Sequence, residues 1–120
     1  MMDRKRTPRI LAAVCAMWAI AGTAVQAAPP EFEIEIRNHL FEPDELTIPA
    51  NTKVKLIVIN RDPTPEEFES FELNREKVIM GGSKAIIFIG PLPPGEYPFF
   101  GEFNPDTALG KIIVSDADAR

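Results

Sequence analysis

Polar and apolar residues alternate over much of the chain after residue 30. In the segment 31–37, acidic residues alternate with Phe32, Ile34 and Ile36, so these apolar side chains share one face of a predicted strand and the other face meets solvent. Alternating or continuous apolar runs predict further strands at 46–48, 53–59, 84–89, 96–100 and 111–114. Proline, glycine or asparagine interrupts the chain between them, and no window of about 11 residues or more after residue 30 has a helical period. This pattern predicts an all-β sandwich.

The N-terminal segment has a different pattern. A basic head is followed by an apolar run from Ile10 to Val25 and by Val25-Gln26-Ala27, which fits a cleavage site with small residues. A membrane anchor would need about 20 apolar residues and a stop-transfer flank. We therefore predict a cleaved signal peptide at 1–27, a single exported domain at 28–120, and no membrane insertion after cleavage.

Removing this segment changes the charge and the cysteine count. Cys15 is the chain's single cysteine, so the predicted mature domain has none. The chain has 13 basic and 18 acidic residues, of which four and one lie in 1–27, so the net charge changes from −5 to −8. A strongly acidic domain disfavours nucleic acid and anionic membranes as partners and favours cations.

The densest acidic segment is 66–76, which contains five glutamates. In an extended chain Glu67 and Glu69 point to the same side. A second segment, 101–106, contributes Glu102. If the two segments meet at one end of the sandwich, these three carboxylates form a cluster whose oxygen atoms suit hard or borderline cations.

The alternative is an acidic face that is simply solvated. Arg75 and Lys77 lie within or beside the same segment and would then neutralise their neighbours. Spacing alone does not separate a metal site from such a face.

Other candidate ligands are weaker. His39 is the only histidine, and a hydrogen-bonded surface role is the alternative to metal binding. Met80 offers a soft thioether, with packing as the alternative. Glu72 and Glu76 are further candidate carboxylates. Nucleophilic catalysis and phosphate binding lack support, because the predicted mature chain has no cysteine, no nucleophile elbow and no glycine-rich phosphate loop.

The order of several motifs resembles the cupredoxin fold over essentially the whole mature chain. The motifs are Phe41-x-Pro43, Leu46-Thr47-Ile48-Pro49-Ala50, a strand ending in Asn60, Pro94-Gly95-Glu96-Tyr97-Pro98-Phe99-Phe100 and Gly110-Lys111-Ile112-Ile113-Val114. Further stretches resemble the EfeO-type cupredoxin-like domain of small periplasmic proteins that accompany bacterial ferrous-iron permeases: Pro65–Ser70, Arg75–Lys77, Gly90–Leu92 and Phe99–Phe103. The resemblance implies a Greek-key β-sandwich of about seven to eight strands.

The same resemblance places the four blue-copper ligands at positions where this chain lacks the histidine, cysteine and methionine side chains that a blue-copper centre uses. The first histidine falls near Glu67, the cysteine at Gly101, the second histidine near Asn104 and the methionine near Ala108 or Leu109. A blue-copper centre needs a thiolate, so none is expected here. Proteins of the iron-associated group that this chain resembles often carry histidine where it has Phe71 and Asn104, so the resemblance argues against tight copper binding.

We therefore expect a periplasmic metal-binding accessory protein of a ferrous-iron uptake system. Its cofactor would be an iron or copper ion held by Glu67, Glu69 and Glu102 with His39. Its partners would be an iron permease or other periplasmic iron-uptake components. We expect a binding protein rather than an enzyme, and assistance to Fe(II) oxidation is the one reaction that the resemblance suggests. The alternative is a metal-free interaction module that docks on a permease or periplasmic partner through the acidic segment or through Phe68, Phe71 and Phe103.

Overall fold

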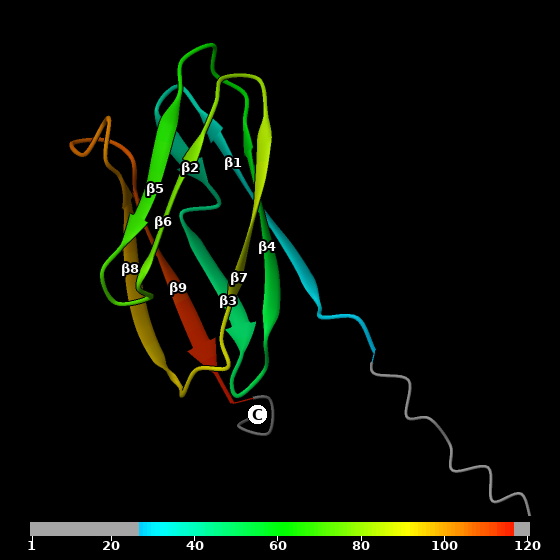
Figure 1. Cartoon of the computed structure of the whole chain (residues 1–120). Helices are drawn as coiled ribbons and strands as arrows, with labels where there is room; N and C mark the ends of the chain where they lie inside the picture. The colour runs from blue at the N-terminus through cyan, green and yellow to red at the C-terminus, as the bar shows by residue number, and fades with distance from the viewer. Residues whose placement is uncertain (1–26, 117–120) are drawn as a thin grey trace, which may run out of the picture.

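The computed structural model describes residues 27–116, which form nine β-strands and no helix (Figure 1). The predicted signal peptide, apart from Ala27, lies outside the described residues. The strands are β1 (Glu31–Arg37), β2 (Leu40–Glu42), β3 (Glu45–Pro49), β4 (Val54–Asn60), β5 (Glu66–Ser70), β6 (Arg75–Ile79), β7 (Lys84–Ile89), β8 (Gly95–Gly101) and β9 (Leu109–Ser115). No helix in this part of the chain is long and apolar enough to cross a membrane.

The strands form two sheets, which Figure 1 shows packed face to face. The four-stranded sheet has the order β2-β1-β4-β7, and the five-stranded sheet has the order β3-β9-β8-β5-β6. The β1–β4 and β3–β9 pairs are parallel and the others are antiparallel. The predicted all-β sandwich is confirmed. It has more strands than expected because 40–42, 66–70 and 75–79 also pair.

Alternation along each strand builds the core, as the sequence predicts. In β4, Val54, Leu56 and Val58 are buried and the residues between them are half-buried. Three phenylalanines from different strands meet between the sheets. Phe68 stacks on Phe99 with ring centroids 4.8 Å apart, and Phe41 contacts both rings edge-on at 6.1 and 4.9 Å. This cluster anchors β5 from the inside.

Buried Asn60 fixes the segment that leads into β5. Its side-chain amide donates to the backbone oxygens of Thr64 and Ile79, at 2.8 and 3.0 Å, and its Oδ1 accepts the N–H of Asp62 at 3.0 Å. The start of β5 is thereby tied to the end of β6. The pairing of β5 with β6 determines which glutamates become neighbours.

Candidate metal site

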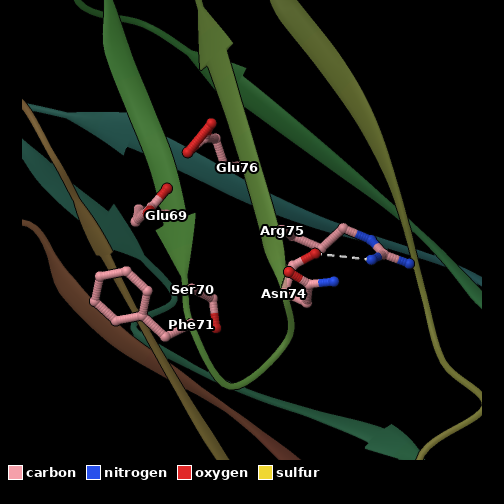
Figure 2. Close-up of a pocket in the computed structure, with 6 residues that line it drawn as sticks. All are labelled: Glu69, Ser70, Phe71, Asn74, Arg75 and Glu76. Carbon is pink, nitrogen blue, oxygen red and sulfur yellow. Dashed lines mark hydrogen bonds between the residues drawn. The ribbon is translucent and has the colours of Figure 1, made fainter.

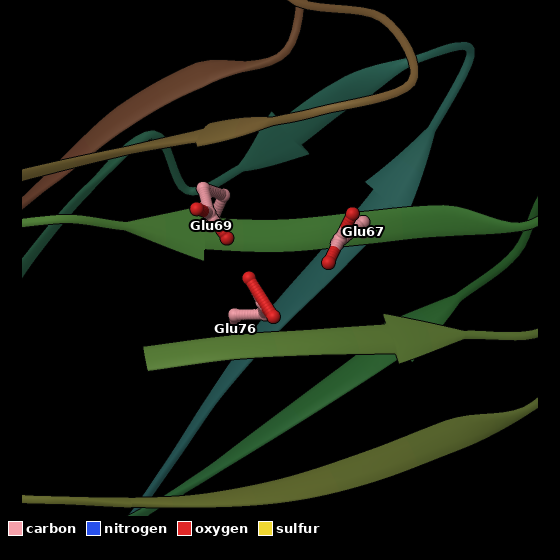
Figure 3. A group of neighbouring side chains, drawn as sticks. All are labelled: Glu67, Glu69 and Glu76. Atoms are coloured by element: carbon pink, nitrogen blue, oxygen red, sulfur yellow. The ribbon is translucent and has the colours of Figure 1, made fainter. Parts of the chain in front are cut away.

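Three glutamates meet on the outer face of the β5–β6 hairpin. Along β5, Glu66, Phe68 and Ser70 are buried, whereas Glu67 and Glu69 point outward and are half-buried. The antiparallel register places Glu76 of β6 directly opposite Glu69. One carboxylate oxygen from each of Glu67, Glu69 and Glu76 lies within 4.8 Å of the others (Figure 3). We call these residues the outer carboxylate cluster.

The cluster is electrostatically unbalanced. Burial, and then repulsion from Glu76, Glu102 and Glu66, raises the pKa of Glu67. Burial is also the largest cause that raises the pKa of Glu69, followed by the charges of Glu76, Glu67 and Glu102 and a hydrogen bond with Glu76. A bound cation would relieve this repulsion, because it supplies the opposite charge.

One oxygen in the cluster lacks a partner. Oε2 of Glu69 is buried and accepts no hydrogen bond within the described part of the chain. An open pocket beside it is lined by Glu69, Glu76, Phe71 and neighbouring hairpin residues (Figure 2). An unpaired buried carboxylate oxygen is costly unless an ion or water completes it.

Arg75 makes no ion pair with the three clustered carboxylates in the described part of the chain, although the solvated-face alternative assigned it that role. Its guanidinium donates to the backbone oxygens of Phe88 and Asn74, both at 2.9 Å. Within residues 27–116, no ion pair joins Arg75 or Lys77 to the three clustered carboxylates. The acidic face is therefore not compensated in the way that the solvated-face alternative assumed.

The other predicted carboxylates lie outside the cluster. Glu102 follows β8, and its N–H donates to the backbone oxygen of Glu67 at 2.9 Å. Its charge acts on the cluster, but its carboxylate is not one of the three that converge. Glu72 is exposed in the β5–β6 turn, and Met80 is exposed after β6. Sequence reasoning ranked Glu102 above Glu76, because the β5–β6 pairing was not anticipated.

His39 lies in the turn between β1 and β2 and is not part of the outer carboxylate cluster. Asn38 and His39 form the two-residue turn between β1 and β2, with positive φ values of 56° and 59°. Both N–H groups donate to the carboxylate of Asp62, at 2.7 and 2.9 Å, and the imidazole Nδ1 lies 3.5 Å from that carboxylate. Burial raises the pKa of Asp62, but the two backbone hydrogen bonds together with nearby positive charge hold the pKa below its ordinary value.

The residues at the blue-copper positions do not fit that metal centre. The resemblance places the first histidine near Glu67, whose side chain points outward, and the neighbouring buried Glu66 points inward beside Gly101, Asn104 and Ala108. This group offers no thiolate, imidazole or thioether, and the Glu66 carboxylate already fills the space next to Gly101. The expectation of no blue-copper centre therefore has a steric reason as well as a chemical one.

Fold and site together define a β-sandwich domain with a carboxylate cluster on the outer face of one sheet. A profile of the cupredoxin-like domain matches residues 10–114, and the chain belongs to this family. A relative from Rickettsia prowazekii (strain Madrid E), called uncharacterized protein RP394, is 40% identical over 121 residues, covering 93% of this chain and 97% of the relative.

Solved structures share the fold at low sequence identity. One is the metal-binding domain of the Cu(I)-exporting P-type ATPase CopA of Streptococcus pneumoniae D39, solved with Cu(I). It has a TM-score of 0.64 at 14% identity, covering 72% of this chain and 85% of that chain. Another is auracyanin A, a blue copper protein of Chloroflexus aurantiacus. It has a TM-score of 0.64 at 13% identity, covering 73% of this chain and 100% of that chain. The purple cupredoxin of Nitrosopumilus maritimus has a TM-score of 0.55 at 22% identity, covering 69% of this chain and 98% of that chain.

Proposed function

We propose that this chain is a periplasmic metal-binding accessory protein of a ferrous-iron uptake system. It binds an iron or copper ion at the outer carboxylate cluster, where Glu67, Glu69 and Glu76 are the ligands and Glu102 adds charge. The observation that carries the proposal is the convergence of three carboxylate oxygens within 4.8 Å, with no cation from the described chain among them.

The chemistry of the donors supports this assignment. Carboxylate oxygens suit Fe(II), Fe(III) and weakly held Cu(II), whereas Cu(I) prefers thiolate and thioether ligands. The half-buried positions of Glu67 and Glu69 limit competition from water. The copper proteins among the structural neighbours show that this fold can carry metals, and the link to iron rests on the resemblance of the Pro65–Ser70 and Phe99–Phe103 motifs to the permease-associated proteins.

Carboxylates also stabilise Fe(III) relative to Fe(II). A site of this kind therefore favours the loss of one electron from bound Fe(II) to an external acceptor such as dioxygen. The residues described here supply the ligands of such a step, and the acceptor comes from outside the chain.

A metal titration tests the proposal. Purified mature protein is titrated with anaerobic Fe(II) and, separately, with Cu(II), and binding is followed by calorimetry and EPR. We expect one ion per chain at micromolar metal. Copper bound here should lack an intense thiolate-to-copper absorption, because the mature chain has no cysteine. Absence of stoichiometric binding for both metals would overturn the proposal.

Matched glutamine variants locate the site. Glu67→Gln, Glu69→Gln and Glu76→Gln should each weaken binding by about tenfold or more, since each removes a charged ligand. Glu72→Gln is the control, because Glu72 carries the same charge in the exposed turn of the same hairpin. Equal losses in all four variants would indicate a general charge effect and not a site.

A second candidate function is a metal-free module that docks on a permease or another periplasmic protein. It is favoured by the exposure of Phe71 and Phe103, which are 73% and 49% exposed, whereas Phe68 is buried in the core. Glu67→Gln together with Glu69→Gln separates the two functions. Metal binding predicts lost iron uptake in cells, while docking through apolar contacts predicts that uptake is retained and that Phe71→Ala abolishes it.

A further inference from the structure

A buried carboxylate occupies the end of the sandwich next to the outer carboxylate cluster. Glu66 is 1% exposed, and its side chain lies between β5 and the 102–108 segment that joins β8 to β9. Oε1 accepts the N–H of Glu67 at 3.0 Å and the N–H of Phe103 at 2.9 Å. Oε2 accepts the side-chain amide of Asn104 at 2.7 Å. Both oxygens are therefore partnered, in contrast to Oε2 of Glu69.

Gly101 makes room for this carboxylate. A Cβ at position 101 would lie 2.6 Å from Cδ of Glu66 and 2.7 Å from Cβ of Ala108. The Gly101 N–H donates to the backbone oxygen of Ala108 at 2.8 Å and closes the 102–108 segment at its base. A side chain at 101 and the carboxylate of Glu66 thus compete for the same space.

We infer that Glu66 acts as an internal anion that replaces a metal ion as the link between β5 and the 102–108 segment. The family resemblance places blue-copper ligands at this end, on segments that the metal would join. Here three hydrogen bonds to one carboxylate join the same segments, and such bonds to a charged acceptor are stronger than neutral ones. Hydrogen bonds of this kind offset the cost of burying the charge.

Two consequences follow for the molecule. The Glu66 carboxylate occupies the interior of this end, so an ion bound here would lie on the outer face of β5 and β6. The Glu66 carboxylate is also not available to the outer carboxylate cluster, because its two oxygens already accept hydrogen bonds from Glu67, Phe103 and Asn104. The inference does not depend on the metal-binding proposal.

A donor–acceptor exchange at positions 66 and 104 tests the inference. Glu66→Gln keeps the size of the side chain but sets its amide against the Asn104 amide. Asn104→Asp sets two carboxylates against each other. The double variant restores one donor and one acceptor, with the charge moved to position 104. In urea unfolding with a chelator present, each single change should lower the folding equilibrium constant about tenfold or more, and the double variant should recover most of that loss. Glu72→Gln is the control and should be unchanged.

Two further measurements complete the test. Amide hydrogen exchange at Phe103 should accelerate at least about tenfold in Glu66→Gln beyond the change in global stability, because its acceptor loses its charge. Cu(II) and Fe(II) affinity should stay within about threefold of the wild type in the same variant, because Glu66 is buried and is not one of the three residues whose carboxylates converge.

The inference is overturned if the double variant is no more stable than the singles, or if Phe103 exchange does not change. It is also overturned if Glu66→Gln loses metal affinity as strongly as Glu67→Gln, or if chelator destabilises the wild type by releasing a bound ion from this end. If the wild type binds no metal at all, the proposed function fails while the unfolding and exchange results still decide the role of Glu66.

Discussion

Replacing Phe68 by alanine tests whether the interior of β5 supports the glutamates on its outer face. Phe68 lies between Glu67 and Glu69 in sequence and is completely buried. Its ring stacks on Phe99 at 4.8 Å and meets Phe41 edge-on at 6.1 Å. Removing the ring takes away both contacts and leaves a cavity between the sheets.

The expected cost follows from these contacts. Truncating a buried phenylalanine to alanine costs about 3–5 kcal/mol, of which the two ring pairs account for about 0.5–1.5 kcal/mol each. A domain of this size has a free energy of unfolding of about 5–13 kcal/mol, at about 0.05–0.15 kcal/mol per residue. Phe68→Ala therefore removes about a quarter or more of the total free energy of unfolding. Phe68→Leu keeps most of the apolar area and should cost about 1–2 kcal/mol.

Urea unfolding followed by far-ultraviolet circular dichroism measures these losses. Phe71→Ala is the matched control, since Phe71 is 73% exposed and has one ring contact, with Phe100 at 5.7 Å. It should change stability by no more than about 0.5 kcal/mol. A loss below about 1.5 kcal/mol for Phe68→Ala, or equal losses at positions 68 and 71, would refute the packing argument.

Three further outcomes are expected. In chelated protein, the free energy of unfolding should fall as pH rises above 4.5, the ordinary pKa of a glutamate. The reason is that the raised pKa values of Glu67 and Glu69 let the folded state bind more protons than the unfolded state in this range. Glu69→Gln should flatten the slope, as measured by urea titrations between pH 4.5 and neutrality. Asp62→Asn should cost about 2 kcal/mol at pH 7, since two backbone donors lose a charged acceptor. Because the pKa of Asp62 is lowered, its contribution is present above the ordinary value of 3.8 and is lost as pH falls through the folded value, so wild-type and variant unfolding curves should converge in acid. Asn60→Ala should cost about 2–4 kcal/mol by calorimetric melting, because it leaves buried backbone groups unpaired, and a melting temperature equal to the wild type would contradict this.

The hairpin turn at Asn38 and His39 shows where the structure places one candidate ligand. The sequence identified His39 as the only imidazole and therefore as a possible ligand. In the fold its backbone forms the turn, and its N–H is held by Asp62, 23 positions away in sequence. A long-range partner of this kind leaves no local signal, so sequence reasoning had no means of finding it.

Much of the fold was determined by the sequence alone, because strand burial has a period of two that can be read locally. The alternation in 31–37 and 53–59 identified the buried residues of β1 and β4. The same period placed Glu67 and Glu69 on one side of the chain, which the structure bears out. Because the predicted mature chain lacks a cysteine, the sequence alone also predicts that no blue-copper centre forms.

Only the tertiary structure decided which side chains meet in the outer carboxylate cluster and which groups surround Glu66. The β5–β6 register placed Glu76 opposite Glu69, and so it and not Glu102 joined the cluster. The same alternation turned Glu66 inward, where the lack of a Cβ at Gly101 and the donors of Phe103 and Asn104 accommodate its charge. The physical reason is that alternation defines the two faces of a strand, whereas strand pairing and loop closure determine which side chains meet on each face.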